Sequence, residues 1–125
     1  MQGRADPSPE GASSESSFDA QAARTLAGDD SELLQRLIAL FFTYTPALLT
    51  QLEGAVKNAD AANIELIAHR LAGSAAMFGA HPARLAARQL EEIGRTGDLR
   101  AAADAHALVQ AEFSRLLTAL ERFQP

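Results

Sequence analysis

Apolar residues recur at helical spacing between Asp60 and Gly79, and this pattern limits the fold more than any other part of the chain. They lie three, four or seven positions apart, as on one face of a helix. The positions are Ile64, Ile67, Ala68, Leu71, Ala75 and Phe78. At 100° per residue, His69 lies about 160° from the centre of this stripe. We therefore predict a helix that begins near Asp60, ends around Gly79 and buries one face while His69 points to solvent.

Small residues surround His69 on its C-terminal side. Ala72 and Gly73 follow it by three and four positions, and Ala76 lies one turn further on. A glycine inside a helix costs roughly 1 kcal/mol relative to alanine, and no core packing explains Gly73 on the outward side. Two interpretations are open: an imidazole kept accessible to a large partner, or an ordinary surface histidine.

A long helix is predicted over residues 31–58. Asp29 and Asp30 offer N-cap oxygens, with Glu32 placed as in a capping box. The predicted core face is Leu33, Leu37, Leu40, Phe41, Tyr44, Leu48, Leu52 and Val56. Pro46 inside the helix predicts a kink near Phe42. Phe42 lies at the edge of the apolar stripe, where it belongs either to the core or to an exposed docking patch.

Two more long helices and one short helix complete the expected fold. Pro82 suits the first position of a helix that ends near Ile93, where Gly94 and Gly97 are expected to break it. Its inward residues are Ala83, Ala86, Ala87, Leu90 and Ile93. Asp98 is expected to cap the last helix. The core face of that helix is Ala105, Leu108, Val109, Phe113, Leu116, Leu117, Leu120 and Phe123. A short helix over residues 18–27 precedes all of these.

The fold class that follows is all-α. No strand-like alternation is present, and four amphipathic helices with short connections predict an antiparallel up-and-down four-helix bundle with a short extra N-terminal helix. Residues 18–125 form this single domain. Residues 1–17 are rich in Gly, Pro, Ser and acidic side chains without apolar periodicity, which predicts a disordered tail or a linker.

Composition excludes several classes of function. The chain contains no cysteine, so disulfides and thiolate chemistry are excluded. A net charge of -5 argues against a general nucleic-acid-binding protein. No apolar run reaches the roughly 18 residues of a membrane span, and no secretory signal is visible. We expect a cytoplasmic monomer without membrane insertion.

The segment from His69 to Ala80 resembles the histidine phosphotransfer (HPt) domain of two-component phosphorelays. The family pattern is roughly His-x-Leu-Lys-Gly-Ser, followed after a short helical interval by Gly-Ala. This chain has His69-Arg70-Leu71-Ala72-Gly73-Ser74 and then Gly79-Ala80, and the similarity extends over residues 18–123. It departs from the pattern at Ala72, where the family has lysine.

The resemblance implies a phosphorelay carrier in signal transduction. His69 would accept a phosphoryl group from an aspartate of one response-regulator receiver domain and pass it to another. A hybrid sensor kinase is a further possible partner, because such domains often occupy its C-terminus. The alternative is a helical docking module that binds or sequesters a response regulator without being phosphorylated.

An exposed imidazole suits this chemistry. The ordinary pKa of imidazole is about 6.5, so the neutral, nucleophilic form is abundant near pH 7. The chain has no Gly-rich phosphate loop, Walker motif or Mg²⁺-binding acid cluster. We therefore expect no enzyme with kinase activity of its own and no cofactor or metal on this chain. The receiver domain would supply the Mg²⁺ and the aspartate.

Several residues are expected to assist His69. The resemblance places the side chain that hydrogen-bonds the second ring nitrogen at Glu91, which is otherwise a solvated acid. Arg88, and then Arg84, are candidates to replace the missing lysine; they could instead pair with Glu91 and Glu92. The expected partner-docking residues are Glu65, Arg70, Ala72, Gly73, Ala76 and Phe42.

A metal-binding or redox bundle is the remaining rival. Glu65 and His69 are four residues apart, but the Glu-x-x-His spacing of di-iron bundles is absent. His81, next to Pro82, is expected in a turn, and His106 is expected on the surface of the last helix.

Overall fold

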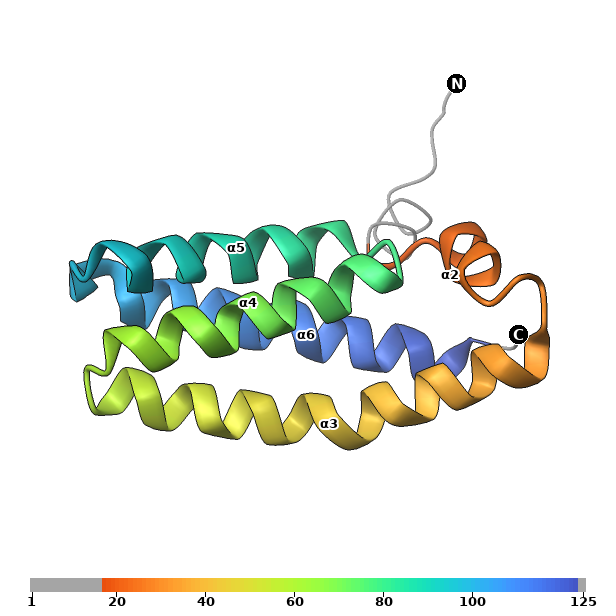
Figure 1. Ribbon diagram of the computed structural model, residues 1–125, viewed down its shortest axis with the longest axis horizontal. Coiled ribbons are helices and arrows are strands. Elements are labelled where there is room, and N and C mark those ends of the chain that lie inside the picture. The colour runs from red at the N-terminus through yellow and green to blue at the C-terminus, as the bar shows by residue number, and fades with distance from the viewer. Residues whose placement is uncertain (1–16, 124–125) are drawn as a thin grey trace, which may run out of the picture.

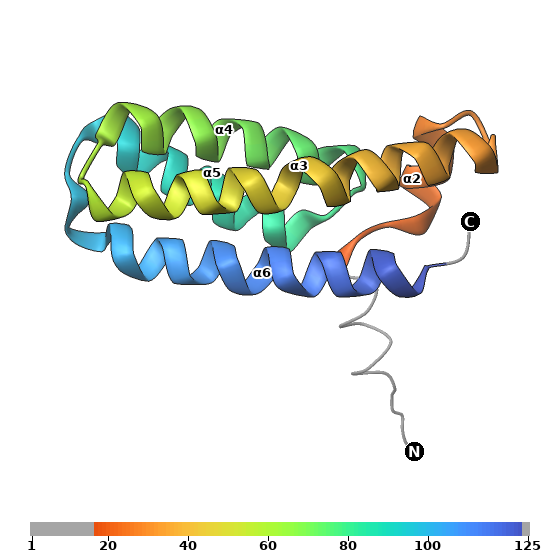
Figure 2. The same ribbon diagram turned by 90° about the horizontal axis from the view of Figure 1, so that it is seen from below.

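The computed structural model describes residues 17–123, and in that range it contains helices and no strand. The elements are α2 (Ala20–Leu26), α3 (Ser31–Lys57), α4 (Ala61–Met77), α5 (His81–Thr96), the 3₁₀ turn η1 (Leu99–Ala101) and α6 (Ala102–Arg122). Helices α3 to α6 lie side by side in an up-and-down bundle, and the short α2 lies near one end (Figures 1 and 2). The predicted fold class is confirmed. The tail predicted over residues 1–17 falls, except for Ser17, outside the described residues.

Aspartates begin most of these helices. Asp30 accepts hydrogen bonds from the backbone N–H groups of Glu32 and Leu33 at 3.0 and 3.1 Å, which satisfies donors that have no partner within the first turn. Asp60 caps α4 in the same way through Asn63. Asp29 lies one residue outside the cap of α3, in a left-handed conformation with φ 63°. The chain therefore enters α3 and α4 where the sequence predicted.

The apolar stripe of α4 is buried as predicted, and it faces the centre of the bundle. All six members are buried, and Ala72 joins them: Ile64, Ile67, Ala68, Leu71, Ala72, Ala75 and Phe78. The phenyl ring of Phe78 packs edge to face on Phe41 of α3, with ring centroids 5.2 Å apart. This burial fixes the rotation of α4, and hence the direction in which His69 points.

The predicted core face of α3 is wrong at three positions in its first half. Leu33, Leu40 and Tyr44 were expected inside but are exposed. The buried residues are Leu34, Ile38, Phe41, Thr45, Leu52 and Ala55. Apolar side chains occupy almost the whole circumference of α3 between Leu33 and Tyr44, so periodicity alone does not select one face. Packing against α4 and α6 selects it, and Thr45 is buried as a consequence.

Two expectations about helix ends also need correction. Gly94 does not break α5; it lies inside the helix, which ends at Gly97 with a left-handed φ of 81°. Asp98 caps η1 rather than α6. On α6, Leu108 is exposed although it was expected in the core. For Gly94 and Leu108, the packing of the neighbouring helices decides whether the residue is buried or exposed.

Helix α3 runs without interruption through Pro46, and it curves along its length (Figure 1). By length and composition it is also a candidate membrane span, which the sequence analysis did not expect. In the bundle its buried face packs against α4 and α6.

Candidate functional site

Helices α4 and α5 form the most extensive helix pair of the bundle. Both helices bury small residues, which allow two helix axes to approach closely along a shared seam. The small buried residues are Ala68, Ala72 and Ala75 of α4 and Ala83, Ala86, Ala87 and Gly94 of α5. The rim of this seam carries the polar residues that the sequence singled out.

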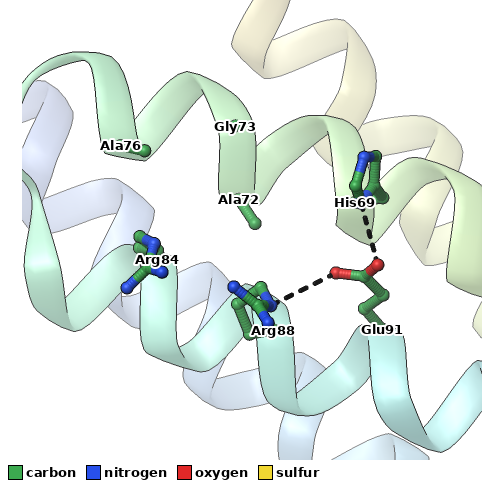
Figure 3. Close-up of a pocket in the computed structure, with 7 residues that line it drawn as sticks. All are labelled: His69, Ala72, Gly73, Ala76, Arg84, Arg88 and Glu91. Carbon is green, nitrogen blue, oxygen red and sulfur yellow. Dashed lines mark hydrogen bonds and ion pairs between the residues drawn. The ribbon is translucent and has the colours of Figure 1, made fainter.

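His69 and Glu91 meet across the rim of the seam. The imidazole Nδ1 lies 2.8 Å from Glu91 Oε2, and 72% of the His69 side chain is exposed to solvent. An ionised carboxylate only accepts hydrogen bonds, so Nδ1 carries the proton of this pair. In a neutral ring the lone pair then resides on Nε2, which points away from Glu91 (Figure 3). The predicted contact between Glu91 and His69 is confirmed, and its role stays a prediction.

Arg88 lies on the other side of Glu91. Its Nε is 3.7 Å from Glu91 Oε1, an ion pair between residues three apart on α5. That oxygen is buried and has no hydrogen-bond partner, so Arg88 supplies the charge that faces it. Figure 3 shows Glu91 between His69 and Arg88. The carboxylate is therefore held from both sides.

A shallow hollow of about 280 Å³ opens beside this row. Its walls carry three charged or polar side chains of α5 and four residues of α4. They are His69, Ala72, Gly73, Ala76, Arg84, Arg88 and Glu91 (Figure 3). The half-buried Arg84 has no ion-pair partner among residues 17–123, whereas Arg95 is paired with Glu92. The alternative in which these arginines pair with Glu91 and Glu92 therefore holds for Arg88, which pairs with Glu91, and for Arg95, but not for Arg84.

The small residues after His69 divide into two kinds. Gly73 and Ala76 are exposed, and a Cβ added to Gly73 would meet no atom within 4 Å. Ala72 is only 4% exposed, which corrects the expectation that it faces solvent. Its methyl group forms part of the seam because α5 approaches closely on that side.

Of the remaining predicted docking residues, Glu65 and Arg70 lie on α4 near His69, whereas Phe42 lies on α3. Glu65 is half-buried and shares a second hollow, of about 370 Å³, with Ala62, Leu66, His69 and Glu91. Arg70 is exposed on α4. Phe42 is half-buried and packs against the core cluster. The exposed apolar side chains of α3 are therefore residues other than Phe42.

Those exposed side chains form a groove that the sequence analysis missed. The groove lies between α3 and α4 and has a volume of about 180 Å³. Its lining is Leu37, Leu40, Phe41, Tyr44, Thr45, Ser74, Met77 and Phe78. Leu40 and Tyr44 are 51% and 61% exposed. The available signal was the excess of apolar residues around α3, which is more than one buried face can accommodate.

The other two histidines lie apart from this site. His81 is the exposed first residue of α5. His106 is half-buried, and its Nε2 is buried without a hydrogen-bond partner, so the expected surface position is wrong. Burial lowers the pKa of His106, and the negative charge of Glu53 opposes that shift. No group of three metal-ligating side chains occurs within residues 17–123.

Comparisons with known proteins agree with this geometry. The model of the Hpt domain family matches residues 36–122. The fold is similar to the crystal structure of histidine-containing phosphotransfer protein B (HptB) from Pseudomonas aeruginosa PAO1, with a TM-score of 0.78 and 22% sequence identity. That match covers 86% of this chain and 96% of the other. A comparison with curated protein sequences found no match.

Proposed function

We propose, from the premise that this chain belongs to the Hpt domain family, that His69 accepts a phosphoryl group from a receiver-domain aspartate and passes it to a second receiver. Domains of this family are phosphocarriers of phosphorelays rather than enzymes. The observation that carries the proposal is the state of the His69 ring. Its Nδ1 is held by Glu91 at 2.8 Å, while the ring is largely exposed.

The chemistry needs only the free nitrogen of this ring. The lone pair of Nε2 attacks the phosphorus of an aspartyl phosphate as the bond from phosphorus to the aspartate oxygen breaks. The aspartate leaves as a carboxylate, and the phosphorylated ring carries a positive charge. Glu91 accepts the Nδ1 proton in a hydrogen bond and offsets that charge. The receiver contributes the Mg²⁺ and the aspartate.

Arg88 and Arg84 replace the lysine that the family has at the position of Ala72. Arg88 holds Glu91 through one long contact of 3.7 Å and exposes 57% of its side chain, so most of its donors remain available. Arg84 lines the same hollow and is unpaired within the described part of the chain. Two guanidinium groups on α5 thus supply positive charge beside an incoming phosphoryl group.

The receiver docks on the outer face of α4 and on the groove beside it. A standard protein interface covers roughly 800 Å² on each partner, so a partner centred on His69 must extend well beyond the ring. Ser74 and Met77 line the groove and lie five and eight residues after His69, or about 8 and 12 Å along the helix axis. The groove therefore lies within the area that a partner centred on His69 must cover, so a receiver domain is the occupant that its position favours. We place this carrier in the cytoplasm as a monomer.

One alternative function keeps a specific observation in its favour. Ala72 departs from the family pattern, and it is buried in the seam. A docking module that binds a receiver without accepting phosphate is compatible with the same groove and the same exposed face. The two functions differ in whether a phosphoryl group is transferred from the receiver to His69.

A transfer experiment separates them. A receiver domain labelled on its aspartate is mixed with this protein, and an unlabelled second receiver is added afterwards. The proposed function predicts that the label moves to this chain within the time of mixing and then to the second receiver. A stable complex in which the label never leaves the first receiver would identify the docking module instead.

A further inference from the structure

Gly94 lies where the backbones of α4 and α5 approach each other closely. It is buried inside α5. A Cβ added there would lie 2.7 Å from the backbone nitrogen of Glu65, 2.9 Å from the carbonyl oxygen of Ala61 and 3.1 Å from Glu65 Cα. These are backbone atoms of α4, so a side chain at position 94 could not be accommodated by a rotamer change. The missing Cβ is what allows the two helices to approach so closely.

This contact lies one helical turn from the His69–Glu91 pair. Glu91 precedes Gly94 by three residues on α5, and Glu65 precedes His69 by four residues on α4, so each step spans about one turn of 5.4 Å. The two helices are antiparallel, and both contacts lie along the same seam. A change in helix separation at Gly94 therefore changes the separation of His69 and Glu91 by nearly the same amount.

We infer that Gly94 is a positioning residue, and that its lack of a side chain sets the helix separation at which Glu91 holds the ring of His69. The inference rests on the function proposed above. Ordinary contacts of a Cβ begin at 3.4 Å, so a methyl group at position 94 pushes the backbones apart by several tenths of an ångström. The Nδ1–Oε2 distance is 2.8 Å, and hydrogen bonds of this type weaken beyond about 3.2 Å. A shift of that size breaks or loosens the contact.

The other glycines inside helices show that this constraint is local. A Cβ added at Gly54 of α3 or at Gly73 of α4 meets nothing within 4 Å. A glycine in a helix interior has a cost in helix propensity, and at Gly94 that cost has a steric reason. Gly54→Ala is therefore a matched control, because it makes the same chemical change without a clash.

The test compares Gly94→Ala and Gly54→Ala by ¹⁵N NMR of the His69 ring and by phosphoryl transfer from a labelled receiver. The wild type and Gly54→Ala should show a neutral ring protonated on Nδ1. In Gly94→Ala the ring should shift toward the Nε2-protonated tautomer. Transfer should slow about tenfold, as small displacements of reacting groups do. In a Glu91→Ala background the Gly94→Ala change should cause no further slowing, because the contact on which it acts is already absent.

Three outcomes would overturn the inference. One is a folded Gly94→Ala protein whose His69 tautomer matches that of the wild type. A second is equal slowing by Gly94→Ala with and without Glu91. If Gly94→Ala does not fold, the Gly54→Ala/Gly94→Ala protein is measured instead, because alanine at position 54 favours the helix. The third outcome is failure of that protein to fold, which would show that Gly94 is needed for the fold itself rather than for the contact between His69 and Glu91. Failure of the wild type to accept phosphate would refute the proposed function and leave the NMR comparison valid.

Discussion

The two flanks of α4 differ in kind, although the same helix builds both. On the α5 flank the helices are joined by alanines and Gly94, and the rim carries His69, Glu91 and Arg88 in contact with one another. On the α3 flank the side chains are large and apolar, and Leu40 and Tyr44 stand open to solvent. The α5 flank orients charged groups, whereas the α3 flank offers apolar surface without chemistry.

This difference separates two tasks that a phosphocarrier must perform. Small residues bring backbones together and hold polar groups within hydrogen-bond distance, which suits the orientation of a nucleophile. Exposed apolar side chains gain free energy when a partner covers them, which suits docking. The α5 flank should therefore control the rate of transfer within a complex, and the α3 flank should control how tightly the complex forms.

Gly73 lies on the exposed face of α4 one turn after His69, and blocking it should have the largest effect. Gly73→Leu places a bulky side chain one turn from His69, where no atom lies within 4 Å of an added Cβ. The fold should remain intact or gain up to about 1 kcal/mol from helix propensity. Phosphoryl transfer should fall below detection in a label-transfer assay. Gly73→Ala is the control and should accept the phosphoryl group at nearly the normal rate. A Gly73→Leu protein as active as this control would show that the partner does not cover the exposed face of α4 at Gly73.

Removal of Glu91 should affect the α5 flank and leave the α3 flank unchanged. In Glu91→Ala the Nδ1 of His69 loses its acceptor at 2.8 Å. We expect transfer within the complex to slow about 10- to 100-fold, the effect typical of removing a residue that orients a histidine. The affinity for the receiver should change less than twofold, as measured by isothermal titration calorimetry. Glu91→Gln, which can still accept the hydrogen bond, should recover most of the rate. Loss of affinity with an unchanged rate would reverse the assignment of the two flanks.

Truncation of the apolar flank should have the opposite signature. The Leu40→Ala/Tyr44→Ala protein should bind the receiver about 30-fold more weakly, because exposed anchors of this kind contribute about 1 kcal/mol each. The rate at saturating receiver should stay unchanged in stopped-flow transfer, and stability should change by about 0.5 kcal/mol or less. Leu108→Ala alters an exposed leucine on α6 and serves as the control. Unchanged affinity would remove the groove from the docking surface.

The loss of Arg88 should give the smallest effect. Arg88→Ala removes the 3.7 Å ion pair with Glu91 and one of the two cations beside the hollow. Because the guanidinium is exposed and screened by salt, we expect transfer to slow about three- to tenfold at low ionic strength and less at high salt. Arg100→Ala, whose arginine pairs with Asp98 at the N-cap of η1, is the control. A rate equal to that of the control would leave Arg84 as the sole substitute for the family lysine.

The sequence predicted one flank better than the other, and the physical reason is helix periodicity. On α4 the apolar stripe is narrow, so its burial and the outward direction of His69 followed directly from it. The contact with Glu91 followed from the family resemblance and the spacing that it implied. On α3 the apolar residues are too many to define one face, and Leu40 and Tyr44 were assigned to the core.

Small residues account for two further errors. An alanine or glycine carries too little apolar surface for the pattern to say whether a neighbouring helix covers it. Ala72 was expected at the surface and Gly94 outside the helix, but both are buried where α4 and α5 meet. Their burial depends on how closely the two helices approach, which is a property of the folded pair. The roles of the site residues remain predictions.

The most direct test of the central claim is the chemistry of the label on His69. The wild type and His69→Gln are each mixed with a receiver labelled on its aspartate, and the products are treated with acid and with base. We predict that the wild type carries a label that acid removes and base does not, as expected for a phosphoramidate and not for an acyl phosphate. His69→Gln should remain unlabelled, with stability within about 0.5 kcal/mol of the wild type, because the residue lies on an exposed face. A labelled His69→Gln protein, or a wild-type label that survives acid, would contradict the claim that His69 carries the phosphoryl group.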